Sequence, residues 1–277
     1  MTVKAPVAMH VFWPAMHLNV TPKELARGTK AKSPEDQAKE RNQRLKELDE
    51  FFDQAHAYAK ARGVPSKNGQ PPAKVPAWEA LLPVVRGELP LIVHADDARQ
   101  IKAALVWAAQ RKYRIAIAGG RDAWRVAEEL AAAKVPVIFE STFDQPFRDT
   151  DAYDAHFKGA ATLHKAGVKV LFSEGSGASN ATSARNTPYA AAQAVAFGLP
   201  EAEALKGLTL YPAQVLGLAG RLGSLEANKD ATFFASDGNI LDLRANVKRM
   251  WIAGREVPLD SRHTRLYEKY KDRPAAK

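Results

Sequence analysis

The residues best suited to chemistry in this sequence stand directly after two short apolar runs. His94, Asp96 and Asp97 follow the run 89–93 and precede a helical stretch. Imidazoles and carboxylates transfer protons near neutral pH, and α/β folds place such groups at the carboxyl ends of buried strands. We therefore expect His94 to lie in a functional crevice.

A second candidate, Glu174, follows the apolar run 168–172. If both runs are strands of one parallel sheet, their carboxyl ends share one edge, so Glu174 and His94 are expected to be near neighbours. The sequence contains no cysteine, which excludes disulfides and thiolate ligands. Any metal ligand must therefore be His, Asp or Glu.

These candidates belong to a repeating pattern of apolar runs and amphipathic helical stretches. The expected strands are 89–93, 113–118, 135–139 and 168–172, and the helices that follow the first three are 98–110, 122–133 and 154–165. Repeats of roughly 25 to 30 residues indicate successive parallel βα units, because parallel strands require crossover connections. A barrel and a doubly wound sheet satisfy this pattern equally well.

The first third of the chain predicts one strand and one long helix. The strand 7–13 contains His10, which we interpret as a hydrogen-bonded core residue rather than a ligand. A helix is expected over 34–62, because it follows an N-capping serine, starts with proline and stops before a glycine. The segment 64–76, rich in Pro and Gly, is expected to be a surface loop.

The last third predicts three short helices and then a change to strands. Helices are expected over 187–197, 200–207 and 208–217. Short strands and hairpin turns are expected over 222–257, and a basic helix over 260–271. We predict three segments: 1–88 leading into the sheet, 89–218 with most of the βα units, and 219–277 with the small β module.

Composition narrows the class of protein. The 277 residues are 46% hydrophobic, enough for a sizeable core. No apolar run approaches the roughly 18 residues of a membrane helix, and no signal peptide is recognisable, so we expect no membrane association and, by default, a cytoplasmic protein. The net charge of +9 is spread along helices beside acidic residues, so no nucleic-acid partner is expected.

Short motifs follow one another in order in the last third of the chain: Gly198-Leu199-Pro200, Leu208-Thr209, Pro212-Ala213, Leu216-Gly217, Leu222-Gly223-Ser224-Leu225-Glu226, Lys229-Asp230-Ala231 and Ile252-Ala253-Gly254-Arg255-Glu256-Val257. This series resembles the C-terminal signature of the amidohydrolase superfamily, most closely its imidazolonepropionase-like branch. The resemblance implies a metal-dependent (β/α)₈ barrel. The expected fold class is thus α/β, a partial TIM-type barrel with a small C-terminal β-sandwich portion.

The resemblance also implies a set of metal ligands. In such enzymes these are a His-x-His pair on the first strand, a carboxylated Lys or a Glu on the fourth, single histidines on the fifth and sixth, and an Asp on the eighth. His94 matches the fifth-strand position, and Glu174 replaces the Asp of the eighth. The sixth-strand position reads Gly119-Gly120, and no His-x-His occurs in the sequence.

We therefore predict His94 and Glu174 as ligands of Zn²⁺ or another divalent metal, Glu174 and Asp96 as catalytic groups, and Asp97 as a residue that orients His94. The predicted function is hydrolysis of a non-peptide or dipeptide-like carbon–nitrogen bond in a small-molecule substrate, weakened or incomplete in this chain. The alternative is an inactive, metal-free barrel remnant or binding protein. A homo-oligomer or a companion chain is expected to supply the remaining half of the barrel.

Overall fold

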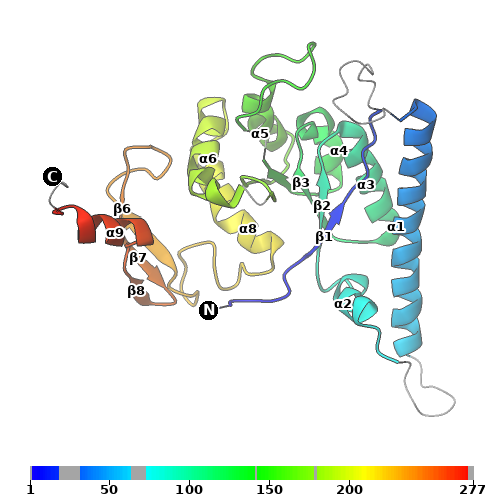
Figure 1. Cartoon of the computed structure of the whole chain (residues 1–277), viewed down its shortest axis with the longest axis horizontal. Helices are drawn as coiled ribbons and strands as arrows, with labels where there is room; N and C mark the ends of the chain where they lie inside the picture. The colour runs from blue at the N-terminus through cyan, green and yellow to red at the C-terminus, as the bar shows by residue number, and fades with distance from the viewer. Residues whose placement is uncertain (1, 19–31, 64–72, 141, 178–179, 274–277) are drawn as a thin grey trace.

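The computed structural model describes residues 2–18, 32–63, 73–140, 142–177 and 180–273. Its centre is a five-stranded parallel sheet whose strands lie in sequence order (Figure 1). The strands are β1 (Met9–Phe12), β2 (Leu91–Ala95), β3 (Ile115–Gly119), β4 (Val137–Phe139) and β5 (Val170–Phe172). Neighbouring parallel strands in sequence order, joined by helices, form a partial TIM-like barrel rather than a doubly wound sheet.

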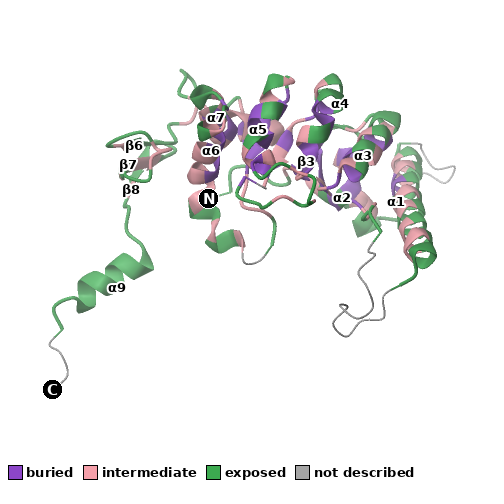
Figure 2. Cartoon of the chain, turned by 90° about the horizontal axis from the view of Figure 1, so that it is seen from above, coloured by how far each residue is buried: buried purple, intermediate pink, exposed green. Residues whose placement is uncertain are grey.

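Helices connect the strands and line one side of the sheet (Figure 2). They are α1 (Pro34–Arg62), α2 (Pro76–Val85), α3 (Ala98–Arg111), a 3₁₀ turn (Ala123–Val126) that leads into α4 (Ala127–Ala132), α5 (Ala155–Lys165), α6 (Thr187–Ala196), α7 (Glu201–Leu208) and α8 (Leu210–Val215). Two further 3₁₀ turns, Asn180–Thr182 and Ala184–Asn186, follow β5. The expected helix 122–133 therefore begins as a 3₁₀ turn.

Local signals fix where the helices begin. The Ser33 side chain accepts a hydrogen bond from the Asp36 backbone, and Pro34 occupies the first turn of α1. Asp97 caps α3 in a reciprocal capping box with Gln100. Asp97, which was predicted to orient His94, is therefore the N-cap residue of α3.

The two faces of the sheet have different surroundings. On β2, Leu91, Val93 and Ala95 belong to the main apolar core under the helices. Alternation along a strand places Ile92 and His94 on the opposite face, which in a closed barrel is the inner one. Across the β1–β2 register Phe12 pairs with His94, and the Phe12 side chain is 69% exposed on this open face.

The C-terminal region forms a separate antiparallel sheet of β6 (Phe233–Ser236), β7 (Val247–Ile252) and β8 (Arg255–Val257). The expected strands over 222–234 are confined to the start of β6. Helix α9 (Arg262–Tyr270) follows and extends away from the body, exposed along its whole length (Figure 2). The described part of the chain contains no helix that is long and apolar enough to cross a membrane.

Most of the expected loop 64–76 lies outside the described residues, and its last residue, Pro76, begins α2. The predicted segment boundaries remain predictions. Strand β1, from the first predicted segment, pairs directly with β2 of the second.

Candidate active site at the carboxyl ends of the strands

His10 and His94 meet on the open face of the sheet. Their Nδ1 and Nε2 atoms are 2.8 Å apart, a hydrogen-bonding distance. The His94 ring also stacks on Phe12, with 4.1 Å between ring centroids. Burial, and then repulsion by His10, hold the pKa of His94 below its usual value. The expectation that His10 is a core residue is wrong, because its side chain is exposed, although it is hydrogen-bonded.

Asp96 lies two residues beyond His94 and fills the space beside β3. Gly119, at the end of β3, has φ +87°, and a Cβ added there would come within 2.5 Å of Asp96 Oδ1. The same carboxylate oxygen accepts a hydrogen bond from the backbone N–H of Arg121 at 3.4 Å. The position at which the sequence resemblance implies a histidine therefore holds a left-handed glycine beside an aspartate.

Glu140, the first residue after β4, is the most perturbed carboxyl of this region. Burial, with a further contribution from Asp96, raises the pKa of Glu140 to about 7. A carboxyl group with such a pKa exchanges its proton at neutral pH, which suits a general acid or base. Sequence reasoning missed Glu140, although it follows an apolar run in the same way as the other candidates.

Glu140 and Glu174 line the same cavity. This cavity has a volume of about 420 Å³ and is also bounded by Thr142, Asp144 and Asn180. Burial raises the pKa of Glu174, and its Oε1 atom is buried without a hydrogen-bond partner. The pocket is large enough for a small molecule.

His94 and Glu174, predicted to be near neighbours, are linked in the described structure only through Asp96 and Glu140. Asp96 acts electrostatically on both His94 and Glu140, and Glu140 shares the cavity with Glu174. Strands β2 and β5 are separated by two others, or about 14 Å at ordinary strand spacing. The shared site of His94 and Glu174, and their catalytic and metal-binding roles, remain predictions.

An ion-pair network holds the long loop between β4 and α5 against the mouth of the half-barrel, the edge formed by the carboxyl ends of the strands. Arg148 donates two hydrogen bonds to Asp122, at 2.9 and 2.5 Å, and its guanidinium lies 3.8 Å from Asp97. Arg125 pairs with Asp151 beside it. The Arg148 guanidinium keeps the pKa of Asp122 below its ordinary value, against the effect of burial. This network positions the loop that bears Phe143 and Asp144.

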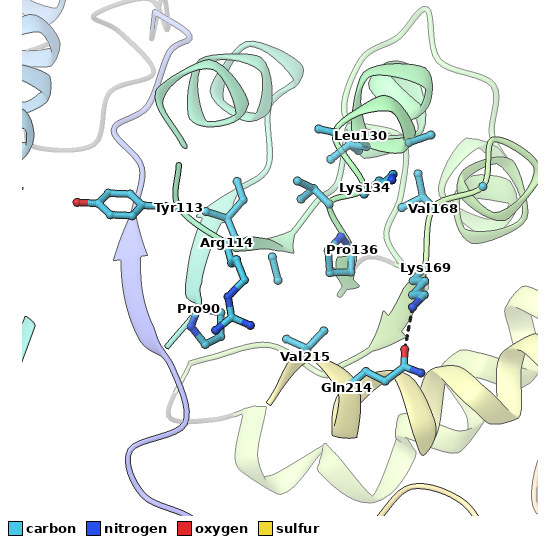
Figure 3. Close-up of a pocket in the computed structure, with 16 residues that line it drawn as sticks. Pro90, Tyr113, Arg114, Leu130, Lys134, Pro136, Val168, Lys169, Gln214 and Val215 are labelled. Atoms are coloured by element: carbon cyan, nitrogen blue, oxygen red, sulfur yellow. Dashed lines mark hydrogen bonds between the residues drawn. The ribbon is translucent and has the colours of Figure 1, made fainter. Parts of the chain in front are cut away.

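A second cavity opens at the other end of the sheet (Figure 3). It has a volume of about 550 Å³ and is lined by apolar residues with Arg114, Lys134 and Lys169 at its wall. Lys169 donates to the Gln214 side chain at 2.8 Å. This end carries the amino termini of the strands, and none of the described residues that line the cavity is a carboxylate or an imidazole. The chemistry is therefore expected at the opposite end.

The residues present do not fit the metal site implied by the sequence resemblance. Within the described ranges, no group of three or more His, Asp or Glu side chains could hold a metal ion. His94 directs Nε2 at His10, and the Asp96 carboxylate occupies the space beside Gly119. A catalytic zinc usually has three protein ligands.

The half-barrel with a polar mouth at its carboxyl ends defines an α/β-barrel class of protein. The Amidohydrolase family matches residues 5–257, so the chain belongs to that family. It is 25% identical over 188 residues to the protein named "Amidohydrolase tasK" of Hapsidospora irregularis, covering 64% of this chain and 18% of that relative.

Among solved structures, the amidohydrolase of Thermotoga maritima MSB8 is similar over 92% of this chain and 63% of its own, with a TM-score of 0.69 and 25% identity. The chain thus spans less than two thirds of each of these relatives. The five strands therefore correspond to part of the barrel. Membership of the imidazolonepropionase-like branch remains a prediction.

Proposed function

We propose that this chain is a hydrolase of the amidohydrolase type that acts on a carbon–nitrogen bond of a small molecule bound at the mouth of the half-barrel. Family membership supports hydrolysis. The observation that carries the proposal is the cavity shared by Glu140 and Glu174, in which one carboxyl has a pKa of about 7. Such a pair provides one proton-transfer group and one binding group.

In the proposed reaction Glu140 acts as the general base. Its carboxylate takes a proton from water as the water oxygen attacks the carbonyl carbon. Glu140 then delivers that proton to the leaving nitrogen as the carbon–nitrogen bond breaks, giving a carboxylic acid and an amine. Burial raises the pKa of Glu140, and the negative charge of Asp96 raises it further by repulsion.

The test is an assay of the full chain against N-acyl amino acids, dipeptides and cyclic amides. Glu140→Gln should lower kcat by about 10²- to 10⁴-fold, the usual contribution of a general base. Because the base must be ionised, the wild-type rate should rise with pH through about 7 and then level off. Glu88→Gln, which removes an exposed charge before β2, is the matched control and should retain full activity. Equal rates for Glu140→Gln and wild type would refute the assignment.

The alternative is a metal-free binding protein without catalysis. The described residues contain no metal-binding cluster. We expect the chain to retain little zinc after dialysis, measured by elemental analysis, and His94→Ala and Glu174→Gln to change that content little. Stoichiometric zinc that is lost in either variant would contradict this expectation and identify a metallohydrolase.

A further inference from the structure

Two buried acceptor atoms in the carboxylate cavity have no partner within the described chain. The Thr142 side chain is 2% exposed, and its Oγ1 makes no hydrogen bond. Glu174 Oε1 is likewise buried and unpaired. Both residues line the same cavity. Buried polar atoms are usually paired, and leaving one unpaired destabilises the fold. The carboxylate oxygen can only accept and the hydroxyl oxygen can accept as well as donate, so a donor group in the cavity would satisfy both.

The walls of this cavity favour a positively charged occupant. Its acidic residues are Glu140, Asp144 and Glu174, and no described lysine or arginine lines it. The charge of the cavity is thus opposite in sign to that of the whole chain, which carries a net charge of +9. Phe143, half exposed at the wall, adds an aromatic face that can attract a cation.

We infer that this cavity binds the ammonium group of a cationic small molecule, which donates hydrogen bonds to Thr142 Oγ1 and Glu174 Oε1. An ammonium group has three N–H donors and no acceptor, and it can therefore donate to both unpaired oxygens at once. A hydroxyl and a carboxylate oxygen both accept from it, and the bond to the carboxylate is strengthened by charge.

An organic cation fits better than a metal ion. A metal ion needs several ligands converging on one point, and the described residues offer no group of three acidic or imidazole side chains in that arrangement. Hydrogen bonds from an ammonium group reach acceptors that stand further apart. That the bound cation is the substrate rests on the proposed function. That the cavity binds a cation does not.

The test uses n-butylammonium chloride as the probe and n-butanol as its uncharged counterpart. Each is titrated into the ¹⁵N-labelled full chain at pH 8 and constant ionic strength, and amide shifts give the Kd. We expect saturable binding of n-butylammonium with shifts at Thr142 and Glu174, and at least tenfold weaker binding of n-butanol. Equal affinities for the two probes would overturn the inference.

Substitutions distinguish the two acceptors from general charge. Thr142→Val and Glu174→Gln should each weaken n-butylammonium binding about tenfold, whereas Thr142→Ser, which keeps the hydroxyl, and Glu88→Gln should bind as wild type does. Wild-type affinity in both Thr142→Val and Glu174→Gln would overturn the inference. So would Mg²⁺ or Zn²⁺ producing the same shifts at lower concentration than n-butylammonium, since that outcome identifies a metal site.

The outcome is separable from the proposed hydrolysis. Cation binding without any amide hydrolysis would overturn the proposed function alone. Hydrolysis of uncharged amides without cation binding would overturn this inference alone.

Discussion

Burial of the Glu140 carboxyl raises its pKa from 4.5 to about 7, with repulsion by Asp96 as a second cause. Between these values the folded chain binds more protons than the unfolded chain. The free energy of unfolding contributed by this group therefore falls as the pH rises from about 4.5 to about 7. Above pH 7 the charged Glu140 carboxylate therefore destabilises the fold, and the proposed proton transfer makes use of its raised pKa.

Glu140→Gln should consequently be more stable than wild type at pH 8, by about 1–3 kcal/mol, and similar to it at pH 5. Urea denaturation at the two pH values measures the difference. Glu88→Gln should show no such pH-dependent gain. A Glu140→Gln variant no more stable than wild type at pH 8 would contradict the assigned burial effect.

His156 in α5 is a second buried titratable residue, with an effect of opposite sign. Its side chain is 1% exposed and neither ring nitrogen has a hydrogen-bond partner in the described structure. Burial lowers the pKa of His156, while Asp144, Asp122 and Asp151 act against burial and Arg121 acts with it. In the unfolded chain the histidine has its ordinary pKa of about 6.5, so below that pH the unfolded state binds more protons than the folded state. The free energy of unfolding therefore decreases as the pH falls below about 6.5.

We expect His156→Leu to remove part of this acid sensitivity. Measured at pH 7.5 and 5.5, the stability of the variant relative to wild type should increase by about 1 kcal/mol at the lower pH. Because Glu140 acts in the opposite direction, the variant is compared with wild type at each pH. Substitution of the exposed His263 by Gln is the control. An unchanged difference between the two pH values would refute the prediction.

At the scale of elements, ion pairs tie the loop between β4 and α5 to the segments that follow β2 and β3. Arg148 is the central cation, bound to Asp122, whose side chain is only 3% exposed. Removing the arginine leaves this buried carboxylate with only Arg125, 3.9 Å away, and the backbone N–H of Ala98 as partners. This usually costs several kcal/mol, in contrast to the loss of an exposed pair.

Arg148→Met should therefore destabilise the fold by about 2–4 kcal/mol. Arg244→Met, which breaks an exposed pair with Asp242, should leave the free energy of unfolding almost unchanged. Chemical denaturation measures both. Hydrogen exchange should show that Arg148→Met opens the loop after β4. Equal effects of the two substitutions would mean that the buried network contributes little.

At the scale of the whole molecule, the sheet ends at two strands that no other described strand covers on the outer side. On β5, helix α7 packs closely, and a Cβ at its Gly207 would lie 2.7 Å from the Val170 carbonyl. On β1, the exposed Phe12 stands beside the unpaired edge. A barrel removes its edges only when it closes, so an open half-barrel favours association.

We therefore expect the chain to self-associate or to bind a companion that supplies further strands. Light scattering after size-exclusion chromatography should show a mass that increases with concentration. Phe12→Lys should reduce the association, because charge on an edge strand opposes pairing. Phe234→Lys, in the separate small sheet, is the comparison. A monodisperse monomer over the whole concentration range would contradict the expectation.

The sequence by itself determined the order of the βα units, the bounds of the long helix and the end of the sheet that carries His94, Asp96 and Glu174. The reason is that these features follow from local signals. Apolar periodicity, helix caps and prolines act within one element, and all parallel strands point their carboxyl ends to one edge.

Only the tertiary structure decided which groups share an environment. The contact of His10 with His94 joins residues 84 positions apart. The raised pKa of Glu140 depends on burial and on Asp96, a residue that follows another strand. The unpaired oxygens of Thr142 and Glu174 became recognisable only when two strand ends enclosed one cavity. Burial, desolvation and pairing depend on long-range packing, which no local pattern of residue types specifies.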